Sequence, residues 1–233
     1  MEIQIGVAKI NKYASAESGD TLEVVERPGG GLSVVLADGQ RSGKSAKMIS
    51  NLVVRKVISL LAEGVRDGAA ARAAADTLYT HRGGKVQSTL NILSIDLETR
   101  SLVITRNNPA PVLVHANGQT KSLGEESQPV GLKRNTRPVI SELGLTQGLM
   151  VALFTDGLTF AGVRKNTPLD IGALFERMIN GGAQPQGIAD GLMEEAMKLE
   201  DNRPGDDISV VVLGVLPRGE DEVRRMWVRL PLT

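Results

Sequence analysis

The sequence contains no cysteine and only two histidines, His81 and His115, among 233 residues. Without cysteine, the chain has no disulfides, no thiolate metal sites and no phosphatase or protease chemistry based on a cysteine nucleophile. Aromatic residues form 3% of the chain, which argues against surfaces that stack nucleic-acid bases. Basic and acidic residues balance at 27 each, and no apolar run approaches the roughly 20 residues of a spanning helix. We therefore expect a cytoplasmic protein with no nucleic-acid or membrane partner.

Hydrophobic residues form 41% of the chain, and this content and length predict one folded domain over residues 1–233. Alternating apolar residues predict strands at 3–12, 22–25, 32–37, 89–98, 101–107, 111–116, 137–143, 149–156 and 208–216. Helical spacing predicts a helix from residue 42 or 43 to about 63, an Ala-rich helix after a break at Asp67-Gly68 that runs to about 79, and helices over about 168–180 and 185–200. Residues 223–233 are predicted to form an extra strand or a tail. Because blocks of strands and helices alternate, the pattern indicates an α+β fold of layered sheets and helices.

Aspartates, often beside a glycine, recur next to the apolar strand segments. They are Asp20, Asp38 with Gly39, Asp156 with Gly157, and the pair Asp206 and Asp207. Carboxylate oxygens are the ligands that Mg²⁺ and Mn²⁺ prefer. Such carboxylates gathered at strand ends would repel one another unless cations compensated them. The pattern therefore predicts a site for two divalent cations.

Two other interpretations of these segments stay open at this point. Asp-Gly is a common turn dipeptide, and Asp67-Gly68 and Asp190-Gly191 occur in surroundings with no catalytic feature. Residues 39–45, GQRSGKS, also resemble a phosphate-binding P-loop between a strand and a helix. A P-loop has four residues between its glycines, whereas Gly39 and Gly43 have three between them. A P-loop-like nucleotide-binding protein is thus the weaker alternative.

The order of the motifs resembles the metal-dependent protein phosphatases. The segments are SGD at Asp20, ADG at Asp38, NNPAPVLV, QPVGL, LFTDGLTFA at Asp156 and GDDISVVVL at Asp206. They are similar to the branch that contains SpoIIE, RsbU and RsbX, and most similar to the stand-alone stressosome phosphatases of the RsbX type. The resemblance implies a four-layer α-β-β-α sandwich in which helices flank two antiparallel sheets. It also implies hydrolysis of phosphoserine or phosphothreonine on a bacterial signalling protein, expected to be a STAS-domain stressosome component.

The resemblance assigns a role to each acidic residue. Asp20, Asp38, Asp156 and Asp206 match the catalytic metal ligands, and the Gly39 carbonyl is expected to join them. Asp207 is the neighbouring candidate for the last position, where we favour Asp206. Two Mn²⁺ or Mg²⁺ ions are implied as cofactors.

One position departs from the family pattern. The branch usually has D-G-x-G-x-G, whereas this chain has DGQRSG, with Arg41 in place of a glycine. Arg41 and Lys44 are therefore candidates for contact with the substrate phosphate, or else solvated residues at the start of a helix. The altered loop also leaves open a catalytically inactive, phosphatase-like binding module. The sequence makes no prediction of oligomeric state.

Overall fold

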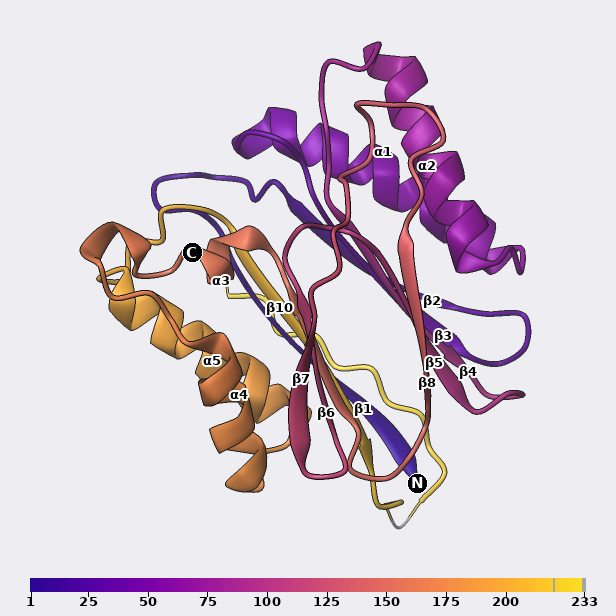
Figure 1. Ribbon diagram of the computed structural model, residues 1–233, viewed down its shortest axis with the longest axis vertical. Coiled ribbons are helices and arrows are strands. Elements are labelled where there is room, and N and C mark those ends of the chain that lie inside the picture. Colours follow the sequence, from indigo (N-terminus) through magenta and orange to yellow (C-terminus); the bar gives the residue numbers. More distant parts are fainter. Residues whose placement is uncertain (220, 232–233) are drawn as a thin grey trace.

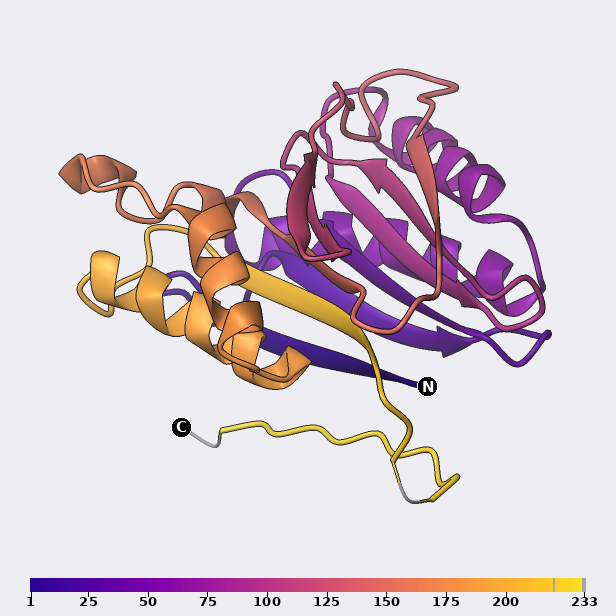
Figure 2. The ribbon, with the colours of Figure 1, turned by 60° about the horizontal axis from the view of Figure 1, so that its bottom comes forward.

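Two antiparallel sheets, each of five strands, pack face to face between two pairs of helices in the computed structural model, which describes residues 1–219 and 221–231 (Figures 1 and 2). The first sheet has the order β1 (Glu2–Ile10), β10 (Ile208–Leu216), β9 (Met150–Phe154), β6 (Val112–Ala116) and β7 (Gln119–Leu123). The second has the order β2 (Asp20–Glu26), β3 (Leu32–Asp38), β4 (Leu90–Asp96), β5 (Ser101–Asn107) and β8 (Val139–Gly144). All neighbouring strands in both sheets are antiparallel.

The helices cover the outer faces of the two sheets (Figure 1). Helices α1 (Gly43–Ala62) and α2 (Asp67–Arg82) pack on the second sheet, and α4 (Ile171–Asn180) and α5 (Pro185–Leu199) pack on the first. A short helix, α3 (Asp156–Thr159), and a 3-10 turn, η1 (Val163–Lys165), follow β9. The predicted α+β sandwich of four layers is therefore confirmed.

Three apolar layers lie between the four layers of secondary structure, and strand β3 shows why. Val35 and Ala37 pack under α1 and α2, whereas Val34 and Leu36 face the opposite sheet. This follows from the two-residue period of a strand, which sends alternate side chains to opposite faces. Strands buried on both faces therefore read as continuous apolar runs.

The same alternation directs polar residues to one end of the layer between the sheets. Leu22 and Val24 of β2 face this layer, so Asp20 at the start of the strand is on the same face. Val34 and Leu36 place Asp38 on that face at the end of β3. The inter-sheet core thus ends in carboxylates at this edge.

Some elements differ from the sequence prediction. Strand β7 and helix α3 lay outside the predicted ranges, because β7 is a largely exposed, polar edge strand and α3 has four residues. In the segment predicted as an extra strand or a tail, residues 223–231 form no helix or strand, and Leu232 and Thr233 lie outside the described residues. Figure 2 shows this segment running apart from the sheets. None of the helices in the described ranges combines the length and apolarity that a membrane crossing requires.

Candidate metal centre

Asp20 and Asp38 lie directly opposite each other in the register of β2 and β3. Side chains of directly opposed residues in an antiparallel pair share one face, with their Cβ atoms about 5 Å apart. Two carboxylates in this position repel, and the pairing of their strands fixes them there. The sheet itself therefore brings together the first two predicted ligands.

The pKa values of these carboxyl groups show the strain of this arrangement. Burial, followed by the charges of Asp20, Asp156 and Asp206, raises the pKa of Asp38 to about 9. Burial also raises the pKa of Asp20, to about 6, although a hydrogen bond from Ser209 opposes the rise. The pKa of Asp156 is raised by burial and then by Asp206. Four predicted ligands are therefore electrostatically coupled at one end of the sandwich.

The carboxylate of Asp20 is held by residues of the opposite sheet. Ser209 of β10 donates its hydroxyl to Asp20 Oδ2 at 2.6 Å, and Thr155, which follows β9, donates at 3.1 Å. The other oxygen, Oδ1, is buried and has no hydrogen-bond partner among the described residues. An unpartnered carboxylate oxygen in a buried site is costly, and a cation would satisfy it.

The neighbours Asp206 and Asp207 have different surroundings. Asp207 is buried, and its Oδ1 and Oδ2 accept backbone N–H groups from Lys12 and Gly19, both at 2.8 Å. Asp207 thereby anchors the loop between β1 and β2. Asp206 is exposed, and in the described part of the chain its carboxylate accepts one hydrogen bond, from the Asp207 backbone N–H at 3.0 Å. Of the two, Asp206 has the less occupied carboxylate.

The glycines beside Asp38 and Asp156 are required by close backbone contacts. A Cβ on Gly39 would lie 2.0 Å from the carbonyl oxygen of Ala46 in α1. A Cβ on Gly157 would lie 2.1 Å from the carbonyl oxygen of Asp207. Both distances exclude any side chain without a backbone shift. These two Asp-Gly pairs are therefore more than turns, because each glycine lets another segment of the site pass directly over it.

Sequence reasoning missed two lysines and a serine at this site. Lys9 and Lys47 each donate to the backbone carbonyl of Asp20 at 2.7 Å, and thus bring positive charge to the acidic cluster. Ser88 donates its hydroxyl to the carbonyl of Asp38 at 2.7 Å. Strand parity predicts Lys9, which shares a strand face with Val7, Ile5 and Ile3, whereas Ser88 has no local signal.

Arg41 and Lys44 are both exposed near the Asp38–Gly39 turn. Arg41 has φ 81°, a left-handed conformation that favours glycine. The backbone of this loop therefore follows a glycine-type path even though its residue is arginine. A non-glycine residue in this region costs roughly 1–2 kcal/mol, and such strain is found at functional sites.

The donor set fits divalent cations in its chemistry. It offers carboxylate and carbonyl oxygens only, one of them without a partner, at a place where like charges accumulate. Within residues 1–219 and 221–231, however, no three His, Cys, Asp or Glu side chains are arranged to hold a metal ion.

The P-loop alternative does not match the fold. The GQRSGKS segment lies between β3 and α1, as a P-loop would, but β3 pairs antiparallel with both β2 and β4. P-loop proteins build this motif on a parallel sheet.

Comparison with known proteins shows that the sequence is similar to stage II sporulation protein E. A family model described as "Stage II sporulation protein E (SpoIIE)" matches residues 28–216. Stage II sporulation protein E of Bacillus subtilis (strain 168) is 23% identical over 232 residues, covering 99% of this chain and 27% of that protein. The protein of the same name from Priestia megaterium is 24% identical over 214 residues, covering 90% and 36%. The chain thus spans about a quarter to a third of these relatives.

Solved structures share the same fold. The PP2C phosphatase domain of SpoIIE from Bacillus subtilis, solved with a fragment of its regulatory domain, has a TM-score of 0.79 at 21% identity, covering 92% of this chain and 64% of that one. RsbX in complex with magnesium has a TM-score of 0.67 at 18% identity, covering 91% and 94%. The catalytic domain of the serine/threonine phosphatase PstP with two manganese ions has a TM-score of 0.68 at 15% identity, covering 92% and 99%.

Proposed function

Because the chain belongs to the SpoIIE family of PP2C-type phosphatase domains, we propose that it hydrolyses phosphoserine or phosphothreonine on a bacterial signalling protein. The observation that carries the proposal is the direct opposition of Asp20 and Asp38 in the register of β2 and β3. Burial and then the charges of Asp20, Asp156 and Asp206 raise the pKa of Asp38. A scaffold gains nothing from such a repulsive cluster, whereas a metal-dependent hydrolase requires one.

The residues that would hold two Mn²⁺ or Mg²⁺ ions are Asp20, Asp38, the Gly39 carbonyl, Asp156 and Asp206. We leave Asp207 out of this set, because both of its oxygens already accept backbone N–H groups. When bound, the two ions supply the Lewis acidity that makes water reactive toward a phosphate ester. Support for this cofactor comes from the magnesium and manganese complexes of the fold relatives.

The protein's own residues orient this site. Ser209 and Thr155 hold Asp20 Oδ2, which leaves Oδ1 for a ligand. Lys9 and Lys47 both donate hydrogen bonds to the Asp20 carbonyl and so fix the start of β2. Arg41 and Lys44, exposed beside the site, would contact the phosphate oxygens of the substrate, and arginine does so with two parallel hydrogen bonds. The strained backbone of Arg41 supports a functional role for its side chain.

The finer identity of the substrate is also part of the proposal. A phosphorylated STAS-domain protein of a stressosome is the substrate that the resemblance of the motifs to RsbX-type phosphatases implies, and RsbX is among the fold relatives. The balance of 27 basic and 27 acidic residues gives the chain as a whole no preference for a polyanion. Selection of a protein substrate therefore has to come from a local surface.

Turnover of p-nitrophenyl phosphate with and without Mn²⁺ tests the reaction. We expect activity that EDTA abolishes and that Asp38→Asn and Asp156→Asn each reduce by at least about a thousandfold. Activity that persists in EDTA and in Asp38→Asn would contradict the metal-dependent mechanism. A folded protein that shows no turnover with Mn²⁺ or Mg²⁺ would instead favour the inactive binding module.

A further inference from the structure

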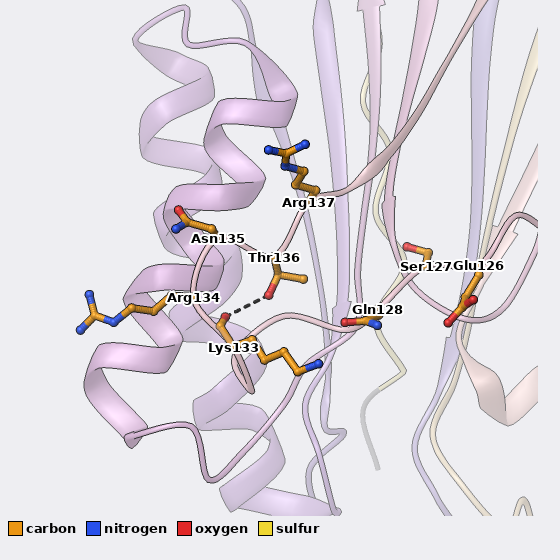
Figure 3. A pocket seen from close by; sticks show the side chains of 8 residues that line it. All are labelled: Glu126, Ser127, Gln128, Lys133, Arg134, Asn135, Thr136 and Arg137. Carbon is orange, nitrogen blue, oxygen red and sulfur yellow. Dashed lines mark hydrogen bonds between the residues drawn. The ribbon is translucent and has the colours of Figure 1, made fainter.

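A basic recess lies beside helix α2, away from the acidic cluster in sequence and opposite to it in charge (Figure 3). It consists of two adjoining cavities of about 410 Å³ each, which share Asn135 and Arg137. Arg72 of α2 completes the first cavity. The second is lined by Glu126, Ser127, Gln128, Lys133, Arg134, Asn135, Thr136 and Arg137. The lining of the two cavities thus holds four cationic side chains and one carboxylate, in a protein whose formal net charge is zero.

The cations of the basic recess are not neutralised by the rest of the protein. Within residues 1–219 and 221–231, no ion pair involves Arg72, Lys133, Arg134 or Arg137. Lys133 and Arg137 are exposed, and in the part of the chain that is described their backbone carbonyls, not their side chains, take part in the hydrogen bonds of this loop. Their donors are therefore available to an external anion.

Hydrogen bonds from strand β5 hold the loop that lines the recess. Asn107 Nδ2 donates to the carbonyls of Gln128 and Arg137, at 3.0 and 3.3 Å, and so ties both ends of the loop to β5. The buried Arg106 donates to the carbonyl of Glu125. Such anchoring lowers the entropy lost when a ligand binds.

The loop is also fixed against α2. The Asn135 backbone N–H donates to Asp76 Oδ1 at 2.8 Å, and the guanidinium of Arg134 lies 5.1 Å from the ring centre of Tyr79. Figure 3 shows the hydroxyl of Thr136 donating to the Lys133 carbonyl, a 2.9 Å bond that closes the turn. The basic recess is therefore a preformed surface.

The same loop leads to the acidic cluster. Val130 pairs with Ser88 through two backbone hydrogen bonds, and Ser88 pairs with Gly39 as an isolated bridge. Each lateral step between neighbouring strands is about 4.8 Å, so Val130 lies about 10 Å from Gly39. The loop that lines the recess therefore continues, at Val130, to the strand segment beside the Asp38–Gly39 turn.

We propose that the basic recess docks an acidic segment of the phosphoprotein substrate, a role that rests on the proposed phosphatase function. Arginines and a lysine around a recess match carboxylates in geometry and charge. Exposed Leu132 and Ile140 near the loop add apolar contacts that a peptide can use. Nucleic acid fits less well, because the ring of Tyr79 on α2 is covered by the guanidinium of Arg134 and offers no free face for a base to stack on.

Binding of a fluorescein-labelled hexaglutamate peptide, measured by anisotropy at low salt, tests the docking directly. Lys133→Glu/Arg137→Glu should weaken binding by about tenfold or more, because two attractive charges become repulsive. The control Lys121→Glu/Arg177→Glu makes the same charge change at exposed positions on β7 and α4, and should change binding less than twofold. Equal binding by the recess variant and the wild type would overturn the proposal. Tighter binding of a single-stranded oligonucleotide at the same residues would overturn the choice of a peptide.

Turnover separates docking from catalysis. With Mn²⁺, the recess variant should hydrolyse p-nitrophenyl phosphate like the wild type, because this small substrate has no segment to dock. For a phosphorylated protein substrate, its KM should rise while kcat stays constant. A wild type without p-nitrophenyl phosphate turnover would refute the proposed function and leave the peptide measurement to decide the docking. If melting shows that the double variant is unfolded, Arg137→Gln replaces it, with an expected loss of about threefold.

Discussion

Replacing Asp38 with asparagine should stabilise the metal-free protein. Burial and the neighbouring aspartates raise the pKa of Asp38 from 3.8 to about 9. Between these two pH values the folded protein keeps a proton that the unfolded chain releases. The contribution of Asp38 to the free energy of unfolding is therefore complete below pH 3.8 and is lost as the pH rises toward about 9. Asparagine resembles the protonated form and removes this dependence.

The size of the effect follows from the same shift. At pH 7 the folded protein loses stability because Asp38 stays protonated, or ionises at a cost, about 3 pH units above its ordinary pKa of 3.8. Each unit is worth about 1.36 kcal/mol, so the loss in the free energy of unfolding is at most about 4 kcal/mol. One kcal/mol corresponds to about 2–4 °C in Tm for a chain of this length. We expect Asp38→Asn to raise the Tm in EDTA by roughly 5–10 °C at pH 7 and by much less at pH 5.

Thermal and urea unfolding in EDTA at pH 5, 6, 7 and 8 measure this difference. The matched control is Asp207→Asn, because Asp207 is also buried but its carboxylate accepts two backbone N–H groups. An amide can accept only one of them well, so this variant should lose about 1–3 kcal/mol at every pH. A Tm for Asp38→Asn below that of the wild type at pH 7 would refute the electrostatic reasoning. Added Mn²⁺ should reverse the order, stabilising the wild type and not Asp38→Asn.

Three further predictions concern the local backbone and the hydrogen bonds of the site. Arg41→Gly should keep the free energy of unfolding or raise it by up to about 1 kcal/mol, because glycine adopts the φ of 81° without strain. The same variant should have a higher KM for a phosphorylated protein. An unchanged KM would exclude Arg41 from substrate binding. Gly157→Ala should cost about 1–3 kcal/mol in urea unfolding, because its Cβ would lie 2.1 Å from a backbone oxygen, whereas Gly29→Ala, with nothing within 4 Å, should cost little. Ser209→Ala should cost about 1–3 kcal/mol at pH 7, since it removes the 2.6 Å bond to the buried Asp20 carboxylate; a neutral result would show that this bond does not stabilise the ionised form.

The strand alternation accounts for much of what the sequence predicts. Val34 and Leu36 face the opposite sheet, so the same two-residue period carries Asp38 to that face. The ends of β2 and β3 could be predicted from the apolar runs, but their register could not, because it depends on which residues of the two strands pair. Only the pairing of Asp20 with Asp38 turns two separate motifs into neighbours.

Other parts of the site have no local signal in the sequence. Asp206 and Asp207 are identical and adjacent, and only the folded loop shows that Asp207 accepts the N–H groups of Lys12 and Gly19. The path of residues 125–137 is fixed by Arg106 and Asn107, whose partners lie about twenty or thirty residues away. These hydrogen bonds are long-range, and no periodic pattern encodes them.

Each of the two sheets contributes two of the four carboxylates. Asp20 and Asp38 belong to strands of one sheet, whereas Asp156 and Asp206 flank β9 and β10 of the other. Ions bound by carboxylates from both sheets would cross-link the two sheets at their acidic edge. Bound cations would then restrict local separation of the two sheets. Amide hydrogen exchange at the ends of β2, β3, β9 and β10 should therefore slow together on addition of Mn²⁺.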